Sequence, residues 1–166
     1  NQVLHHLPDS DAKGYPAYQR VLREFARVLR PTAALVINIC SHEQLLHGFW
    51  PYELIPEATE NMRRRHMPID ELVILLQACG FSYRGRFTPL DAVIQGDAYH
   101  DPRGPLNKQW RDGDSIWAMA TEKEMGRALE HIQELDRKGV LRDFVARHDK
   151  RRKEIGQTTF VFSSRQ

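Results

Sequence analysis

The chain has 166 residues, of which 41% are hydrophobic and 28% are charged. This composition fits one globular domain with a sizeable core, and it excludes collagen-like, low-complexity and wholly disordered proteins. Its 24 basic and 22 acidic side chains leave a net charge of +2. A protein that mainly binds nucleic acid carries a larger and more clustered positive charge, so we expect a small molecule as the ligand.

No segment predicts a membrane span, because the longest mainly apolar run, Ala33 to Cys40, is far shorter than the about 20 residues that a spanning helix needs. Cys40 and Cys79 both lie in apolar segments and lack the spacing of a metal site. Such cysteines are typical of reduced core thiols. We therefore predict a cytoplasmic protein that has no disulfide and binds no metal.

The chain first predicts a helix and a buried strand. Pro16 suits the first turn of a helix, and apolar residues recur at helical spacing from Tyr18 to Leu29, before a break at Pro31. Residues 34–39 form an apolar, β-branched run, which is typical of a strand at the centre of a parallel sheet with both faces buried. A helix followed by such a strand is one unit of an α/β fold.

A second helix and strand follow a mixed segment. Residues 41–67 combine aromatic side chains with helix breakers, and they predict short helices, including one over 57–65. Apolar residues then recur at helical spacing over 69–79, and Gly80 stands where a helix cap is expected. Residues 81–90 alternate weakly and predict a strand.

The last part of the chain predicts a mostly helical region. Residues 91–120 are rich in glycine and proline and predict irregular structure that ends in a short helix or strand. Thr121 and Glu124 form a capping box, in which the hydroxyl and the carboxylate bind free amides at the start of a helix that runs to Gly139. The remaining predicted elements are a helix over 141–148 and a strand over 158–164.

Four segments carry a resemblance to a known family. Asn1–Asp9 contains a Leu-His-His-Leu-Pro-Asp turn, and Leu22–Pro31 ends in Arg-Val-Leu-Arg-Pro before an apolar strand. Leu72–Phe81 ends in Cys-Gly-Phe, and Gly156–Val161 enters the last strand. In this order they resemble class I S-adenosylmethionine-dependent methyltransferases of the small-molecule, ubiquinone-biosynthesis type. The matching parts are the family's fourth strand, the next helix with the fifth strand, the helix before the sixth strand, and the antiparallel seventh strand.

The resemblance implies a Rossmann-like α/β fold, a three-layer sandwich whose N-terminal, cofactor-binding half is absent from the chain. In the family, a G-x-G loop and an acidic residue that bind the cofactor precede the position of Asn1, and no two of the ten glycines here have that spacing. Residues 1–90 would form the C-terminal half of the core, 91–155 a largely helical insertion, and 156–166 the closing strand. The first residues would end a strand beside 34–39, because a buried parallel strand needs neighbours on both sides.

The resemblance also implies residues of the active site. In small-molecule members of the family, a histidine of the His-His turn acts as a base on a hydroxyl or amine, which corresponds to His5 and His6. Asn1 and Gln2 correspond to strand-end positions that border the cofactor, S-adenosylmethionine. The alternative for the histidines is that one packs in the core and the other caps the loop.

Histidine and aromatic side chains gather after the strand at 34–39. Ligands of open α/β sheets bind beyond the carboxyl ends of the strands, so these side chains are predicted to form a wall of the substrate site. The alternative is that they pack a helical lid. The residues are His42, His47, Phe49, Trp50 and Tyr52.

We therefore expect the C-terminal part of a methyltransferase that uses S-adenosylmethionine, acts on an oxygen or nitrogen of a small molecule, and is inactive by itself. Its partner would be the missing N-terminal part or a second copy of the chain. One alternative is a non-catalytic subunit that binds a protein through an exposed sheet edge. Another is an RNA-modifying enzyme, against which the near-neutral charge argues. The basic runs at 63–65 and 150–153 are interpreted as solvated helix ends rather than phosphate contacts.

Overall fold

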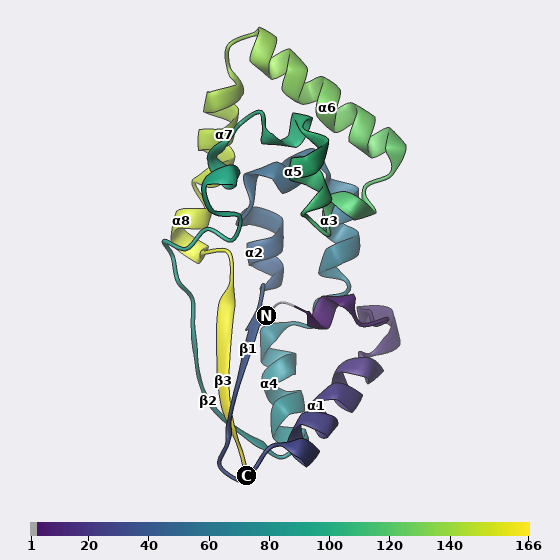
Figure 1. Cartoon of the computed structure of the whole chain (residues 1–166), viewed down its shortest axis with the longest axis vertical. Helices are drawn as coiled ribbons and strands as arrows, with labels where there is room; N and C mark the ends of the chain where they lie inside the picture. Colours follow the sequence, from purple (N-terminus) through teal and green to yellow (C-terminus); the bar gives the residue numbers. More distant parts are fainter. Residues whose placement is uncertain (1–2) are drawn as a thin grey trace. The chain divides into compact units, whose positions relative to one another are not determined.

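The computed structural model describes residues 3–166, which form two compact units (Figure 1). Unit 1 takes its residues from Asn1–His42, Arg64–Pro89 and Thr158–Gln166, and unit 2 from Glu43–Arg63 and Leu90–Gln157. The domain boundaries at residues 90 and 155 stay a prediction. The later segment of unit 2 begins at Leu90, but unit 2 also includes the earlier segment Glu43–Arg63. Within the described residues, no helix is both long and apolar enough to cross a membrane.

Unit 1 is built on a three-stranded sheet in the order β1-β3-β2. The strands are β1 (Ala34–Ile39), β2 (Phe81–Phe87) and β3 (Thr159–Arg165). β3, the last strand of the chain, lies between the other two and runs antiparallel to both. An antiparallel strand is therefore present near the end of the chain, as expected, and it joins residues from distant segments in one sheet; that it closes a methyltransferase core stays a prediction.

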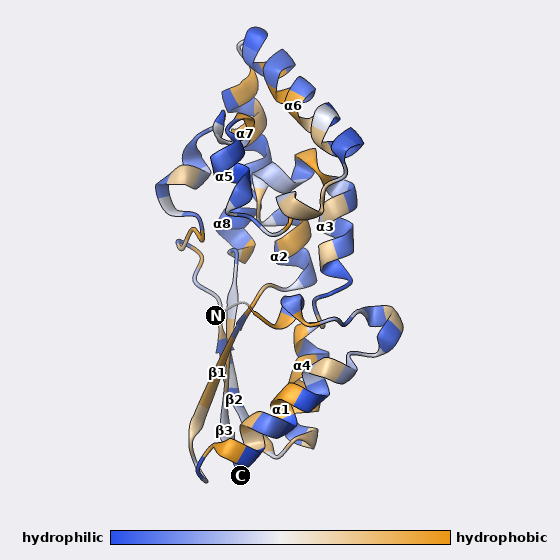
Figure 2. Cartoon of the chain, turned by 45° about the vertical axis from the view of Figure 1, so that its right-hand side comes forward, coloured by the Kyte–Doolittle hydropathy of each residue, from blue (hydrophilic) through white to orange (hydrophobic). Residues whose placement is uncertain are grey.

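Two helices cover one face of this sheet, α1 (Pro16–Val28) and α4 (Ile69–Ala78) (Figures 1 and 2). Both follow the predicted ranges, and Gly80 ends α4 in the left-handed conformation that suits glycine. The buried side chains between the helices and the strands form the core of unit 1, which includes Leu22, Ile37, Leu72, Leu76 and Phe81.

The start of α1 is fixed by the Leu-Pro-Asp turn. The Asp9 carboxylate is buried and accepts a hydrogen bond of 2.9 Å from the backbone amide of Tyr18, in the first turn of the helix. A carboxylate at this position satisfies an amide that the helix leaves without a partner, and it also interacts favourably with the helix dipole. The turn therefore has a structural role in unit 1.

In the described part of the chain, β1 lies at one edge of the sheet. Sequence analysis predicts a central parallel strand with both faces covered, whereas β1 pairs here with β3 alone, in antiparallel orientation, at one edge of the sheet. On the face away from α1 and α4, Val36 is 50% exposed and its partner Phe162 is 38% exposed. An apolar run indicates that a strand is buried, but it does not show which segment covers the strand. Of the three layers expected, unit 1 shows a sheet and one helical layer.

Unit 2 is almost entirely helical. It contains most of α2 (His42–His47), together with α3 (Pro56–Arg63), α5 (Lys108–Asp112), α6 (Glu122–Arg137), α7 (Leu141–Asp149) and α8 (Arg152–Ile155). Short 3₁₀ helices connect these elements, and two more lie in the first segment of unit 1. They span Leu4–His6, Asp11–Lys13, Trp50–Leu54, Gly96–His100, Gly104–Leu106 and Trp117–Met119.

The predicted capping box at α6 forms only in part. The Thr121 hydroxyl accepts the amide of Glu124 at 3.1 Å, as expected. The Glu124 carboxylate does not return to Thr121, because it accepts the amides of Glu57 at 2.7 Å and Ala58 at 3.3 Å at the start of α3. Glu124 is 1% exposed, so this buried carboxylate joins the starts of two helices in unit 2.

Gln157 closes unit 2 by joining segments that are distant in the sequence. Its side chain is fully buried, donates to the carbonyl of Gly48 at 3.0 Å and accepts the amide of Ile94 at 2.8 Å. The backbone at Gly48 is also close to its neighbours: a Cβ atom there would lie 2.6 Å from the carbonyl oxygen of Gln44 and 2.8 Å from that of Gly156. Only glycine fits this crossing without displacing backbone.

We predict that Gly48→Ala lowers the free energy of unfolding by about 1–3 kcal/mol, because the added methyl group overlaps two backbone oxygens. The measurement is denaturant unfolding monitored by circular dichroism. Gly126→Ala is the matched control, since Gly126 lies in α6 with open space around a Cβ atom. This control is expected to gain about 0.5–1 kcal/mol from helix propensity. Equal effects of the two substitutions would contradict the prediction.

Candidate functional site

Three histidines of unit 1 form a cluster, which we call the histidine cluster: His5, His6 and His66. The 3₁₀ helix Leu4–His6 places the ring of His5 between the other two. Its centroid lies 4.1 Å from that of His6 and 4.8 Å from that of His66, and the His5 and His66 rings are nearly parallel at 14°. The structure therefore brings the predicted catalytic pair together with a third histidine from a distant segment.

The segment 64–66 is held by hydrogen bonds to three successive carbonyl groups. The Arg64 carbonyl accepts the amide of Asp11 at 2.9 Å, and the Arg65 carbonyl accepts the Tyr18 hydroxyl at 3.1 Å. The His66 carbonyl accepts the Tyr15 hydroxyl at 2.9 Å and lies 2.7 Å from Nε2 of His42. These bonds fix the backbone that carries His66 against His5. His42, a predicted substrate residue, thus contributes to the frame of the cluster.

Burial makes His5 a poor proton acceptor. Its side chain is 8% exposed, and desolvation is the main reason why its pKa falls from 6.5 to about 3. The charges that His66, His6 and Arg65 carry when protonated lower this pKa further. His5 is therefore neutral at physiological pH and holds a proton weakly, which makes it ill suited to act as a general base near pH 7.

His6 occupies the opposite environment. Its side chain is exposed, so a ligand can reach it, and its ring packs on that of His5. Of the two histidines predicted as bases, the geometry favours His6 for contact with a substrate and His5 for support of the ring. A catalytic role for either residue stays a prediction.

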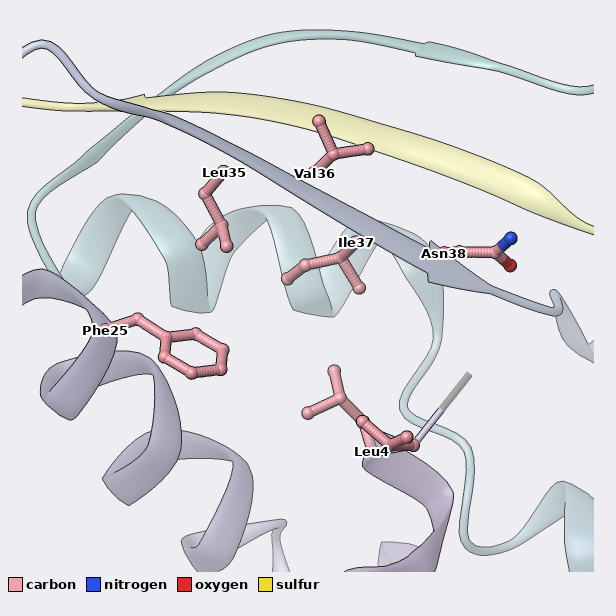
Figure 3. Close-up of a pocket in the computed structure, with 7 residues that line it drawn as sticks. Leu4, Phe25, Leu35, Val36, Ile37 and Asn38 are labelled. Atoms are coloured by element: carbon pink, nitrogen blue, oxygen red, sulfur yellow. The ribbon is translucent and has the colours of Figure 1, made fainter. Parts of the chain in front are cut away.

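An apolar pocket of about 160 Å³ lies against β1 (Figure 3), and Leu4, the residue before His5, is among those that line it. In Figure 3 the side chains of Leu4, Phe25, Leu35 and Ile37 point into it. Its lining suits an apolar group, and Asn38 is the polar residue among those that line it. The remaining lining residues are Val3 and Val36.

The other predicted substrate residues lie in unit 2 and serve mainly in its packing. Trp50 is fully buried, and its indole nitrogen donates to the carbonyl of Tyr99 at 2.9 Å. Tyr52 stacks on Phe49 with centroids 4.6 Å apart. His47 is exposed at the end of α2. This packing agrees with the alternative in which the aromatic side chains pack a helical unit, and substrate binding by these residues stays a prediction.

The Tyr52 hydroxyl belongs to a buried polar network that sequence reasoning did not find. It donates to Oδ2 of Asp114 at 2.9 Å, and the Gln95 amide donates to the same oxygen at 2.9 Å. The backbone amides of Ile116 and Trp117 donate to Oδ1. Burial raises the pKa of Asp114, while these hydrogen bonds oppose the shift. The network holds the start of the 3₁₀ helix at Trp117 in place.

Two further predictions concern the cofactor contacts and metal binding, and both stay predictions. Asn1 and Gln2, the predicted cofactor contacts, lie outside the described residues. Among residues 3–166, no group of three or more histidine, cysteine or acidic side chains has the geometry of a metal site. Sequence reasoning missed His66, which follows the basic run at 63–65 and has no motif of its own.

Comparison with known proteins gives a structural match. No protein-family model and no curated protein sequence matches the chain. A crystal structure from Anabaena variabilis, of a protein assigned as a methyltransferase from an antibiotic biosynthesis pathway, superposes with a TM-score of 0.66. The chain therefore shares the fold of the matched part of that protein. The two sequences are 22% identical, and the match covers 87% of this chain but 60% of the other, so this chain spans less than two thirds of that protein's length.

We predict that acidification destabilises the protein partly through His5. Between pH 6.5 and about 3 the unfolded state binds a proton at this residue and the folded state does not, so stability falls as the pH falls, by up to about 1.4 kcal/mol per pH unit. In urea unfolding at pH 6.5 and 4.5, His5→Gln is expected to lose less stability than the parent chain. The control His47→Gln, at an exposed position, should lose as much as the parent. Identical losses in all three proteins would contradict the assignment.

Proposed function

We propose that the chain is the C-terminal part of a cytoplasmic, S-adenosylmethionine-dependent methyltransferase that acts on an oxygen or nitrogen of a small molecule. The observation that carries this proposal is the position of β3, antiparallel between β1 and β2, which is the closing strand that the resemblance implies. The superposition on the Anabaena protein supports the same fold. The net charge of +2 favours a small acceptor over a polyanion.

Residues 3–166 do not by themselves fit the whole cofactor. The pocket at β1 holds about 160 Å³ and is lined mainly by apolar side chains, whereas ligand sites usually measure about 300–1,000 Å³ and present several polar groups. No glycine pair in the chain has the G-x-G spacing that lets a backbone approach the cofactor closely. In the proposal, residues outside this chain therefore supply most of the cofactor site.

The chain's own contribution to catalysis would be at the acceptor. Methyl transfer is a displacement in line with the bond that breaks, so an enzyme mainly orients its reactants and, where needed, removes a proton from the acceptor. His6 would accept the proton of the acceptor hydroxyl or ammonium group through an exposed ring nitrogen. His5 would keep that ring in place by packing, since it is itself buried and neutral.

A non-catalytic subunit is the second candidate. It is favoured by one observation: within residues 3–166, β1 pairs with a strand on one side only, and Val36, Phe162 and Phe87 are exposed on the same sheet. An unpaired strand beside an apolar surface is suited to bind another polypeptide. Such a subunit would need no cofactor site.

Calorimetry with S-adenosylmethionine tests the proposal. The two samples are this chain and the longest polypeptide whose reading frame contains it. We expect the longer protein to bind with a dissociation constant of about 1–10 μM and this chain to show no heat of binding in the same range. Binding of similar strength by this chain alone would contradict the half-domain interpretation. Absence of binding by both would contradict the methyltransferase proposal and favour the non-catalytic subunit.

A further inference from the structure

Tyr18 connects the two segments that carry the histidine cluster. Its backbone amide donates to the carboxylate of Asp9 at 2.9 Å, in the turn that follows His6. Its hydroxyl donates to the carbonyl of Arg65 at 3.1 Å, in the residue before His66. A single residue of α1 is therefore bonded to both segments, close in sequence to the histidines of each.

The Tyr18 hydroxyl remains a hydrogen-bond donor in the folded protein. Its side chain is fully buried, and burial raises the pKa of Tyr18 well above the usual value, so the hydroxyl keeps its proton at physiological pH. Burying a polar group without a partner is unfavourable, because the group loses its bonds to water. The bond between Tyr18 and Arg65 is thus favoured on both sides.

A second tyrosine, Tyr15, bonds the same segment from a strained backbone. Its φ of 55° and ψ of 46° are left-handed, which is unfavourable for a residue that carries a Cβ atom. Such a conformation persists where the surrounding structure fixes it. The Tyr15 hydroxyl donates to the carbonyl of His66 at 2.9 Å, and the Tyr15 ring makes an edge contact with the Tyr18 ring, with centroids 5.3 Å apart. We call Tyr15 and Tyr18 the tyrosine pair.

The tyrosine pair fixes both peptide groups that flank the Cα atom of His66. The Arg65 carbonyl belongs to the peptide group before this atom, and the His66 carbonyl belongs to the one after it. With both groups bonded, the direction in which the His66 side chain leaves the backbone is set. This side chain is buried, and its ring stacks on that of His5 at 4.8 Å, which in turn contacts the ring of His6 at 4.1 Å.

We propose that Tyr18 and Tyr15 are positioning residues for methyl transfer, which keep the His66 ring on the His5 ring and so set the position of His6, the exposed candidate base. A base acts only within hydrogen-bond reach of the proton that it removes, so a small displacement lowers the rate. The role of His6 as the base rests on the proposed function. The effect of the tyrosine pair on the rings rests on contacts within unit 1 alone.

Nuclear magnetic resonance of the histidine rings in the full chain tests the proposal without any cofactor. The variants are Tyr18→Phe and Tyr15→Phe, each of which removes one hydroxyl and keeps the ring. In each, we expect weaker nuclear Overhauser effects from the His5 ring to the rings of His66 and His6, because the segment that carries His66 is no longer fixed. Tyr15→Phe is the milder change.

The ionisation of His5 gives a second readout. Its pKa is about 3 mainly because of burial. When the ring of His66 moves away and admits water, we expect this pKa to rise by about one unit, which is a tenfold gain in proton affinity. The ring nitrogen signals are followed from about pH 8 to 4, a range in which His5 stays largely neutral in the parent chain. The charged groups that also lower this pKa are His66, His6 and Arg65.

Tyr83→Phe is the matched control. Tyr83 lies on β2 and packs against the same core of unit 1, but it takes no part in the bonds to Arg65 and His66. This variant should leave the ring contacts and the His5 titration unchanged. A tyrosine pair that only stabilises the fold would lower the free energy of unfolding in Tyr15→Phe or Tyr18→Phe and leave both readouts at the parent values. That result, in variants whose dispersed amide spectra show that they fold, would overturn the proposal.

The proposal and the proposed function fail separately. Unchanged ring contacts and His5 titration, together with S-adenosylmethionine binding by the longer protein, would reject the role of the tyrosine pair and retain the methyltransferase. Altered ring contacts and a raised His5 pKa, together with no S-adenosylmethionine binding by the longer protein, would retain the effect of the tyrosine pair on the histidines and reject its role in methyl transfer.

Discussion

The pairing of β3 with both β1 and β2 is the constraint on which unit 1 depends. Val161 is opposite Ile37 on one side and Arg86 on the other, so one strand aligns two segments that come from different parts of the chain. The end of the strand adds further bonds, since the backbone of Arg165 exchanges hydrogen bonds with Thr32 and Ala33. α1 and α4 can share one core because this strand holds their neighbouring strands together.

Such an arrangement requires the chain to leave the sheet after β2 and return to it for β3. Closing a long loop costs entropy that grows slowly with its length, so the return is easier when the intervening residues fold on themselves. Unit 2 does this at Gln157, whose side chain bonds both Gly48 and Ile94. The residue that precedes the last segment of unit 1 is thus anchored within unit 2, and the ends of the long excursion are defined by hydrogen bonds.

Local sequence pattern predicted the elements well and their surroundings less well. Helical spacing predicted α1 and α4, and the β-branched run predicted β3, because the period of apolar residues depends only on residues that are close together in the sequence. The segment that covers β1 was not predictable, since an apolar run shows that a strand is buried but not what buries it. Glu124 illustrates the same limit: its spacing from Thr121 indicates a capping box, but tertiary contact directs its carboxylate to α3.

The candidate site shows that two histidines adjacent in the sequence can have different chemical roles. His5 and His6 are neighbours in sequence, and their difference arises from the segment 64–66, which packs His66 on His5 and leaves His6 exposed. Burial of one ring lowers its pKa and removes it as a proton acceptor, while the same ring supports its neighbour. The sequence could name both histidines, but the division of roles between them required a contact between His5 and His66, about sixty residues apart.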